Sequence, residues 1–108
     1  MISSDSFSIE VLTTGNQARI VARGEIDITT EQALRDAAAS AMASAAGGRI
    51  VVDLQRVSFM DSSGLRALLQ SRDAAEAAGT EFRITAAAEG AVQRLFRAAG
   101  VSDWFGYE

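Results

Sequence analysis

The stretch VSFMDSSGL, residues 57–65, lies between an apolar run typical of a strand and a run with helical spacing. It places an acid, two hydroxyls and a glycine where a helix begins. Asp and Ser side chains accept hydrogen bonds from the unpaired backbone N–H groups of a helix start, and the partial positive charge there favours an anion, including a phosphate added to a serine. Asp61, Ser62 and Ser63 therefore predict either a plain helix cap or a modification switch.

Apolar and polar residues alternate in two runs ahead of this stretch, over 7–12 and 18–23. This period of two is typical of half-buried strands. Turn residues 14–17 separate the runs, so we expect an antiparallel hairpin. Thr29 with Gln32 fits a capping box that opens a first helix.

The rest of the chain reads as alternating strands and helices. The first helix ends at Gly47-Gly48, and a strand over 49–54 follows. Later come a helix with buried Leu65, Leu68, Leu69, Ala75 and Ala78, a strand over 81–85 and a helix over 91–99 that Gly100 closes. Val101, Trp104 and Phe105 are expected to fold back onto the core. A helix that joins two such strands implies a right-handed parallel crossover.

The strands carry apolar residues on one side and polar residues on the other, whereas a sheet covered on both faces reads as continuous apolar runs. We therefore predict an α/β fold with helices mainly on one face of a four-stranded mixed sheet. Its order is 1-2-3-4, because two right-handed crossovers leave helices on one face only when the order advances in one direction. The first pair is antiparallel. The outward residues, including Val51, are expected to face water; the charged ones are Glu10, Arg19, Arg23, Asp53, Glu81 and Arg83.

Composition indicates one globular domain, because 108 residues with 48% apolar content show no break in character. The net charge of −4 without a basic block argues against nucleic acid as a partner. The sequence has no cysteine, histidine or lysine, which removes thiolate metal sites, Ser-His pairs and Schiff-base chemistry. We expect no enzymatic activity and no cofactor.

The apolar runs are all far shorter than a membrane span of about 20 residues, and no basic region precedes an apolar core at the N-terminus. The expected protein is cytoplasmic and has no membrane contact.

The order of strand, GEID at 24–27, alanine-rich helix, apolar strand, SFMDSSGL at 58–65 and helix closely resembles the STAS domain of bacterial anti-sigma factor antagonists, the anti-anti-sigma factors. The segment VQRLFRAAG at 92–100 is similar to the Val-x-x-Leu-Phe-x-x-x-Gly ending of that family. The resemblance covers essentially the whole chain and implies a single STAS domain over 1–108.

The resemblance also implies a function. In that family, the first serine after the aspartate is phosphorylated by a GHKL-type serine kinase that is also the anti-sigma factor, and the matching residue is Ser62. The unphosphorylated antagonist binds the kinase and releases sigma factor; phosphorylation breaks the complex, and a serine phosphatase acting on phospho-Ser62 restores it. The implied partner-binding residues are Glu25, Asp27, Met60, Asp61, Ser63, Gly64, Leu65 and Arg66.

Plainer interpretations of these residues stay open. Asp27 fits a turn residue and Glu25 a solvated strand end, while Met60 and Leu65 fit core positions. Glycine in the first helical turn lowers helix propensity, so Gly64 predicts that something approaches its backbone closely. Packing of the helix against the sheet is enough to explain that approach.

Arg66 is expected to face solvent, close enough to pair with a phosphate on Ser62. The alternative functions are a non-switching STAS subunit of a lipid-transport or stress-sensing complex, and a nucleotide-binding protein or enzyme. The second has little support, because no glycine-rich phosphate loop follows a strand. The expected oligomeric state is a monomer or weak dimer.

Overall fold

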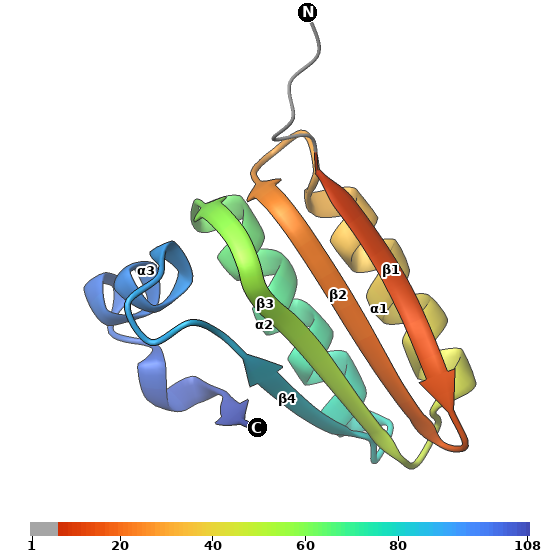
Figure 1. Ribbon diagram of the computed structural model, residues 1–108. Helices are drawn as coiled ribbons and strands as arrows, with labels where there is room; N and C mark the ends of the chain where they lie inside the picture. Colours follow the sequence, from red (N-terminus) through yellow and green to blue (C-terminus); the bar gives the residue numbers. More distant parts are fainter. Residues whose placement is uncertain (1–6) are drawn as a thin grey trace, which may run out of the picture.

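Five strands form one sheet in the computed structural model, which describes residues 7–108 (Figure 1). The strands are β1 Ser8–Thr14, β2 Gln17–Ile26, β3 Arg49–Met60, β4 Glu81–Thr85 and β5 Gly106–Tyr107. They lie in the order β1-β2-β3-β4-β5, with β1 antiparallel to β2 and the other neighbours parallel. The predicted order and the antiparallel first pair are confirmed. The predicted number of four strands misses β5, since a strand of two residues is too short to show alternation.

The helices are α1 Glu31–Ser44, α2 Ser62–Ala77 and α3 Ala91–Ala99, followed by the short 3₁₀ turn η1 Ser102–Trp104. Figure 1 shows α1 and α2 side by side along one face of the sheet, while no helix formed by residues 7–108 covers the opposite face. The prediction of helices mainly on one face is therefore confirmed. The helix α3 lies beyond the end of β4 and packs against β3.

The core lies between the sheet and the helices. Inward side chains of β2 and β3, such as Ile20 and Val52, have no exposed surface. Small residues on α1, including Ala37, Ala38 and Ala41, are buried against them. Because these side chains are short, α1 can approach the sheet closely.

The start of α1 differs from the predicted capping box. The helix begins at Glu31, and the Thr29 hydroxyl donates to Asp27 Oδ1 at 2.6 Å. The Gln32 amide donates to Asp36, one turn further along. The capping box is therefore wrong at this position, because the carboxylate of Asp27 takes the bonds that an N-terminal cap would make and forms a turn instead.

The strand β3 extends to Met60, beyond the predicted end at Leu54. Its register with β2 shifts between Val21 and Arg23, and again between Gly24 and Glu25, and each shift leaves one extra residue on β3. Such bulges break the period of two that a regular strand shows. The buried positions in this half of β3 are consequently three residues apart, at Leu54, Val57 and Met60.

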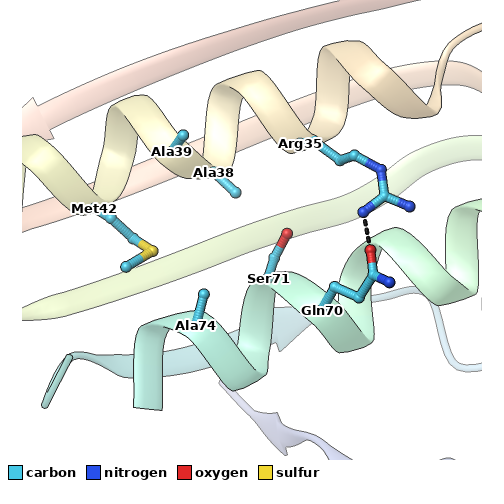
Figure 2. Close-up of a pocket in the computed structure, with 7 residues that line it drawn as sticks. All are labelled: Arg35, Ala38, Ala39, Met42, Gln70, Ser71 and Ala74. Atoms are coloured by element: carbon cyan, nitrogen blue, oxygen red, sulfur yellow. Dashed lines mark hydrogen bonds between the residues drawn. The ribbon is translucent and has the colours of Figure 1, made fainter. Parts of the chain in front are cut away.

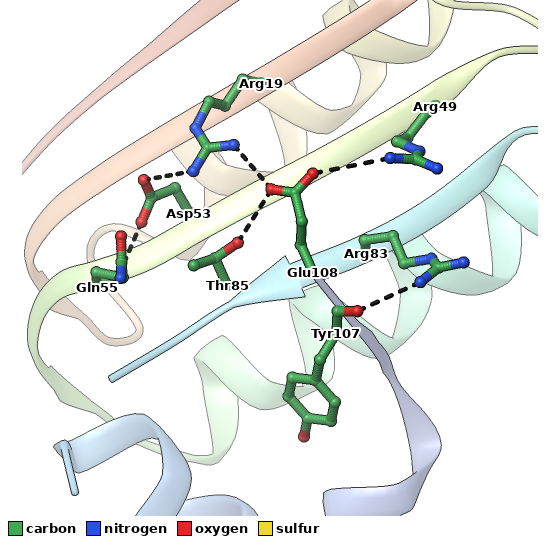
Figure 3. Close-up of polar contacts among 8 residues, drawn as sticks. All are labelled: Arg19, Arg49, Asp53, Gln55, Arg83, Thr85, Tyr107 and Glu108. Carbon is green, nitrogen blue, oxygen red and sulfur yellow. Dashed lines mark hydrogen bonds and ion pairs between the residues drawn. The ribbon is translucent and has the colours of Figure 1, made fainter. Parts of the chain in front are cut away.

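The uncovered face of the sheet carries a network of arginines and carboxylates (Figure 3). Arg19 donates to Asp53 at 3.0 Å and to Glu108 at 3.0 Å, and Arg49 donates to Glu81 at 3.0 Å. The charged residues predicted for this face lie on it. Val51 was expected to face water but is only 4% exposed, because it lies opposite Arg19 in the sheet, within a face that these long side chains cover.

The C-terminal residues fold back in part. Val101 and Phe105 are buried, and the ring of Phe105 stacks on Phe96 with centroids 5.1 Å apart. Trp104 is 52% exposed, because η1 turns its side chain away from the core. Ala78 is also exposed, since it follows the last turn of α2. These two burial predictions are wrong.

Candidate functional site

The candidate site lies at the carboxyl ends of β2 and β3, where the chain passes into α1 and α2. Both connections are at the upper end of the sheet in Figure 1. The parallel pairing of Ile26 with Met60 joins the two strand ends, and Asp61 N–H donates to the Ile26 carbonyl at 3.3 Å. Carboxyl ends of parallel strands are where functional loops gather. The two motifs GEID and MDSSGL, separate in sequence, are brought together here.

Asp61 caps α2. Its backbone is extended, and its Oδ1 accepts the N–H of Ser63 at 2.9 Å and that of Gly64 at 3.4 Å. One carboxylate therefore satisfies two of the unpaired donors at the helix start. The hydroxyls of Ser62 and Ser63 are not needed for the cap, and no hydrogen bond engages the Ser62 hydroxyl within residues 7–108.

Replacing Asp61 with alanine is expected to lower the free energy of unfolding by about 0.5–2 kcal/mol, the usual contribution of a side-chain N-cap. Asn at this position keeps an oxygen acceptor, so Asp61→Asn is expected to retain most of that stability. Urea denaturation of both variants measures the difference. An alanine variant as stable as the wild type would contradict the capping role.

Ser62 is the first residue of α2, and its side chain is exposed. Ser63 is half-buried and donates its backbone N–H to Asp61. Arg66, four residues after Ser62, is exposed on the same face of the helix. A phosphate on Ser62 would therefore have the positive end of α2 and one guanidinium near it.

Gly64 lets α2 approach the sheet. A Cβ atom at this position would lie 2.7 Å from Met60 Cγ and 2.8 Å from Ile26 Cγ2, closer than Cβ contacts in proteins. The predicted close approach to its backbone is confirmed, and the neighbour is the end of the sheet. Met60 and Leu65 are buried, at 4% and 8% exposure. They therefore belong to the core beneath the site and leave little surface for a partner to contact.

Asp27 organises the connection between β2 and α1. Its Oδ1 accepts the N–H of Thr29 at 2.9 Å and the hydroxyl of Thr29 at 2.6 Å, and its own N–H donates to the Thr30 hydroxyl at 2.9 Å. Thr30 in turn donates to the carbonyl of Glu25, whose side chain is exposed. The hydrogen bond from the Thr29 hydroxyl, followed by the Thr29 N–H, lowers the pKa of Asp27 below its ordinary 3.8.

The substitution Thr29→Ala is expected to raise the pKa of Asp27 back toward 3.8, because it removes the largest cause of the shift. The folded pKa lies below the unfolded one, so ionised Asp27 favours the folded state above pH 3.8, and this contribution is lost as the pH falls through the folded pKa. An NMR titration of the Asp27 carboxyl carbon measures the shift. Gln32→Ala is the control, and equal midpoints in wild type and Thr29→Ala would refute the assignment.

Two exposed residues near the site were not predicted from the sequence. Ile28, in the turn that Asp27 holds, is 66% exposed, and Phe59, next to Met60, is 45% exposed. The sequence held one signal, since Ile28 stands between polar residues outside any periodic run. Phe59 gave none, because it lies in the part of β3 beyond the predicted end of the strand at Leu54.

The comparisons with known proteins agree with this geometry. A family model described as Mlab, STAS domain, matches residues 9–106. The chain belongs to the STAS domain family. None of the curated protein sequences compared with this STAS domain matches it.

Solved structures similar to this STAS domain include anti-sigma factor antagonists. The crystal structure of one from Mycobacterium paratuberculosis is 25% identical with a TM-score of 0.81, over 99% of this chain and 89% of that chain. The anti-sigma factor antagonist SpoIIAA in its unphosphorylated form is 24% identical with a TM-score of 0.73, over 95% and 88%. The phosphorylated form of the Bacillus cell fate determinant SpoIIAA is 23% identical with a TM-score of 0.69, over 95% and 91%. The two SpoIIAA structures establish the shared fold.

A groove of about 170 Å³ lies between α1 and α2 of this STAS domain (Figure 2). Ala38, Met42 and Ala74 line it, and a hydrogen bond from Arg35 to Gln70 closes one end. The volume is below the roughly 300–1,000 Å³ of small-molecule sites. We therefore assign no ligand to it.

Between residues 7 and 108, no three acidic side chains gather to hold a metal ion. No helix in that range is long and apolar enough to cross a membrane.

Proposed function

We propose that this STAS domain is an anti-sigma factor antagonist that a phosphate on Ser62 switches off. Its partner is an anti-sigma factor with a GHKL-type serine kinase fold, and binding of the partner releases a sigma factor. The observation that carries the proposal is the exposed Ser62 on the first turn of α2, where Asp61 alone supplies the cap. The similarity to anti-sigma factor antagonists, one of them solved in both phosphorylation states, supports it.

Electrostatics explains why Ser62 suits a switch. A phosphate adds about 1.5–2 negative charges, which the positive end of a helix tolerates. Arg66 lies one turn away and can pair with the phosphate. The fold can therefore accept the charge without rearrangement, whereas a partner surface packed over Ser62 would have to bury it. Burial of an unpaired charge is strongly unfavourable, so phosphorylation releases the partner.

The remaining parts of the proposal follow from this switch. A serine phosphatase acting on phospho-Ser62 restores binding. The STAS domain works in the cytoplasm, where sigma factors act, as a monomer or weak dimer. It acts by binding, without catalysis, cofactor, nucleic acid or membrane contact.

The test uses the unphosphorylated protein and the GHKL-type kinases of its own organism. We expect one of them to co-elute with the chain in size-exclusion chromatography, and the complex to dissociate after ATP is added. Mass spectrometry should then locate one phosphate on Ser62. The proposal fails if none of these kinases binds the chain or phosphorylates it.

A non-switching subunit of a lipid-transport or stress-sensing complex is the second candidate. It is retained because the matching family model is described as Mlab, STAS domain, rather than as an antagonist. This candidate predicts co-purification with a transporter ATPase or a large assembly, in amounts that Ser62→Asp does not change.

A further inference from the structure

Two large apolar side chains are exposed beside Ser62. Ile28 is 66% exposed and Phe59 is 45% exposed. The other exposed large apolar residues between positions 7 and 108 lie on β1 or in the C-terminal segment; they are Leu12, Trp104 and Tyr107. A single exposed apolar residue is ordinary for a protein surface. Two of them at one edge of the sheet, flanking a serine, are typical of a protein contact.

The backbone pairing places both residues next to Ser62. Ile26 pairs with Met60, so Ile28 and Ser62 each lie two residues beyond a paired position at the end of adjacent strands. Phe59 precedes the buried Met60 and therefore points toward the uncovered face of the sheet. Ile28 consequently lies in the turn that leads to α1, and Phe59 lies on the open face of the sheet, both close in the chain to the strand ends that pair beside Ser62.

Hydrogen bonds hold both residues in place. The turn that carries Ile28 is fixed by the bonds of Asp27 with Thr29 and Thr30, at 2.6–2.9 Å. Phe59 pairs with Glu25 across the bulge, and the neighbouring Ser58 hydroxyl donates to the Gly24 carbonyl at 3.3 Å. A backbone that is already fixed loses less conformational entropy when a partner binds it.

We propose that Ile28 and Phe59 form an apolar docking pair that anchors the serine kinase on either side of Ser62. This inference rests on the proposed function, since a kinase must cover the neighbours of the hydroxyl that enters its active site. The partner surface that fits the pair has two apolar depressions around its active-site entrance. Fully desolvated apolar anchors of this kind provide most of the binding energy of protein interfaces.

The docking pair also explains why phosphorylation of Ser62 releases the kinase. A phosphate on Ser62 would lie between two contacts that exclude water. Its charge would lose solvation, and the apolar depressions would add no partner to Arg66, so the binding of the phosphorylated form is costly. The same two side chains that anchor the unphosphorylated form therefore make the complex sensitive to phosphorylation.

The test compares Ile28→Ala and Phe59→Ala with wild type in binding to the kinase and in the initial rate of Ser62 phosphorylation. Each substitution is expected to raise the dissociation constant about tenfold or more, the effect typical of anchor residues. Leu12→Ala is the matched control, because Leu12 is 51% exposed and pairs with Arg19 near the start of β2, at the other end of the sheet. It is expected to change binding less than twofold. Denaturation curves should show that the variants remain folded.

The outcomes separate this inference from the function on which it rests. If wild type is phosphorylated on Ser62 and both alanine variants bind as tightly as wild type, the docking pair is wrong and the proposed function stands. If Leu12→Ala weakens binding as much as the two variants, the pair is also wrong, because the effect is not local. If no kinase binds or phosphorylates the wild type, both proposals are overturned.

Discussion

Replacing Ser62 with alanine is expected to abolish phosphate incorporation into the chain while binding to the unphosphorylated partner persists. The hydroxyl is exposed and takes no part in the helix cap, so its loss removes the acceptor and leaves the fold unchanged. Incubation of the variant with the kinase and radiolabelled ATP measures incorporation. Full labelling of Ser62→Ala would defeat the assignment of the site.

Ser62→Asp tests the other state of the switch. Its single negative charge imitates a phosphate only in part, because a phosphate carries about 1.5–2 charges and three acceptor oxygens. We expect this variant to bind the kinase more weakly than Ser62→Ala does, by about tenfold. Ser40→Ala is the control, since Ser40 is an exposed serine in the second half of α1, outside the implied partner-binding residues, and should leave both binding and phosphorylation intact.

Gly64→Val is expected to cause the largest loss of stability, about 3 kcal/mol or more in the free energy of unfolding. Even a Cβ atom would lie 2.7 Å from Met60 and 2.8 Å from Ile26, and valine adds two further methyl groups. Overpacking of this kind typically costs about 1–3 kcal/mol, and a β-branched residue gains little helix propensity in return. Chemical denaturation of the variant measures the loss.

Ser62→Val is the matched control for Gly64→Val. It makes a valine two residues earlier in the same helical turn, where the side chain is exposed. Substitutions at such surface positions usually change stability by less than about 0.5 kcal/mol. If both valine variants were equally stable, the contact of α2 with the end of the sheet would be loose, contrary to the packing described above.

Regular patterns in the sequence predicted most of the fold. Period-two alternation located β1, β2 and β4, and the glycine at position 100 marked the end of α3, where its φ of +72° terminates the helix. The bulges of β3 were missed. They depend on how β2 pairs with β3, and that information lies outside a local window.

The candidate site was predictable where it depends on local chemistry. Asp61 and Ser62 stand out at the start of a helix, because capping requires only residues close in sequence. Ile28 and Phe59 did not stand out, since Ile28 lies in a turn outside any periodic run and Phe59 lies beyond the predicted end of β3. Met60 and Leu65 were given two roles by the sequence, and their burial favours the core role.

The strand order β1-β2-β3-β4-β5 has a consequence for how the chain reaches its native state. Every strand lies beside the strand that precedes it in sequence. No strand has to be inserted between two that have already paired, so the loops closed at each step stay short, and folds with such local connections form faster. During synthesis, the β1–β2 hairpin and β3 can assemble with α1 before β4 has left the ribosome.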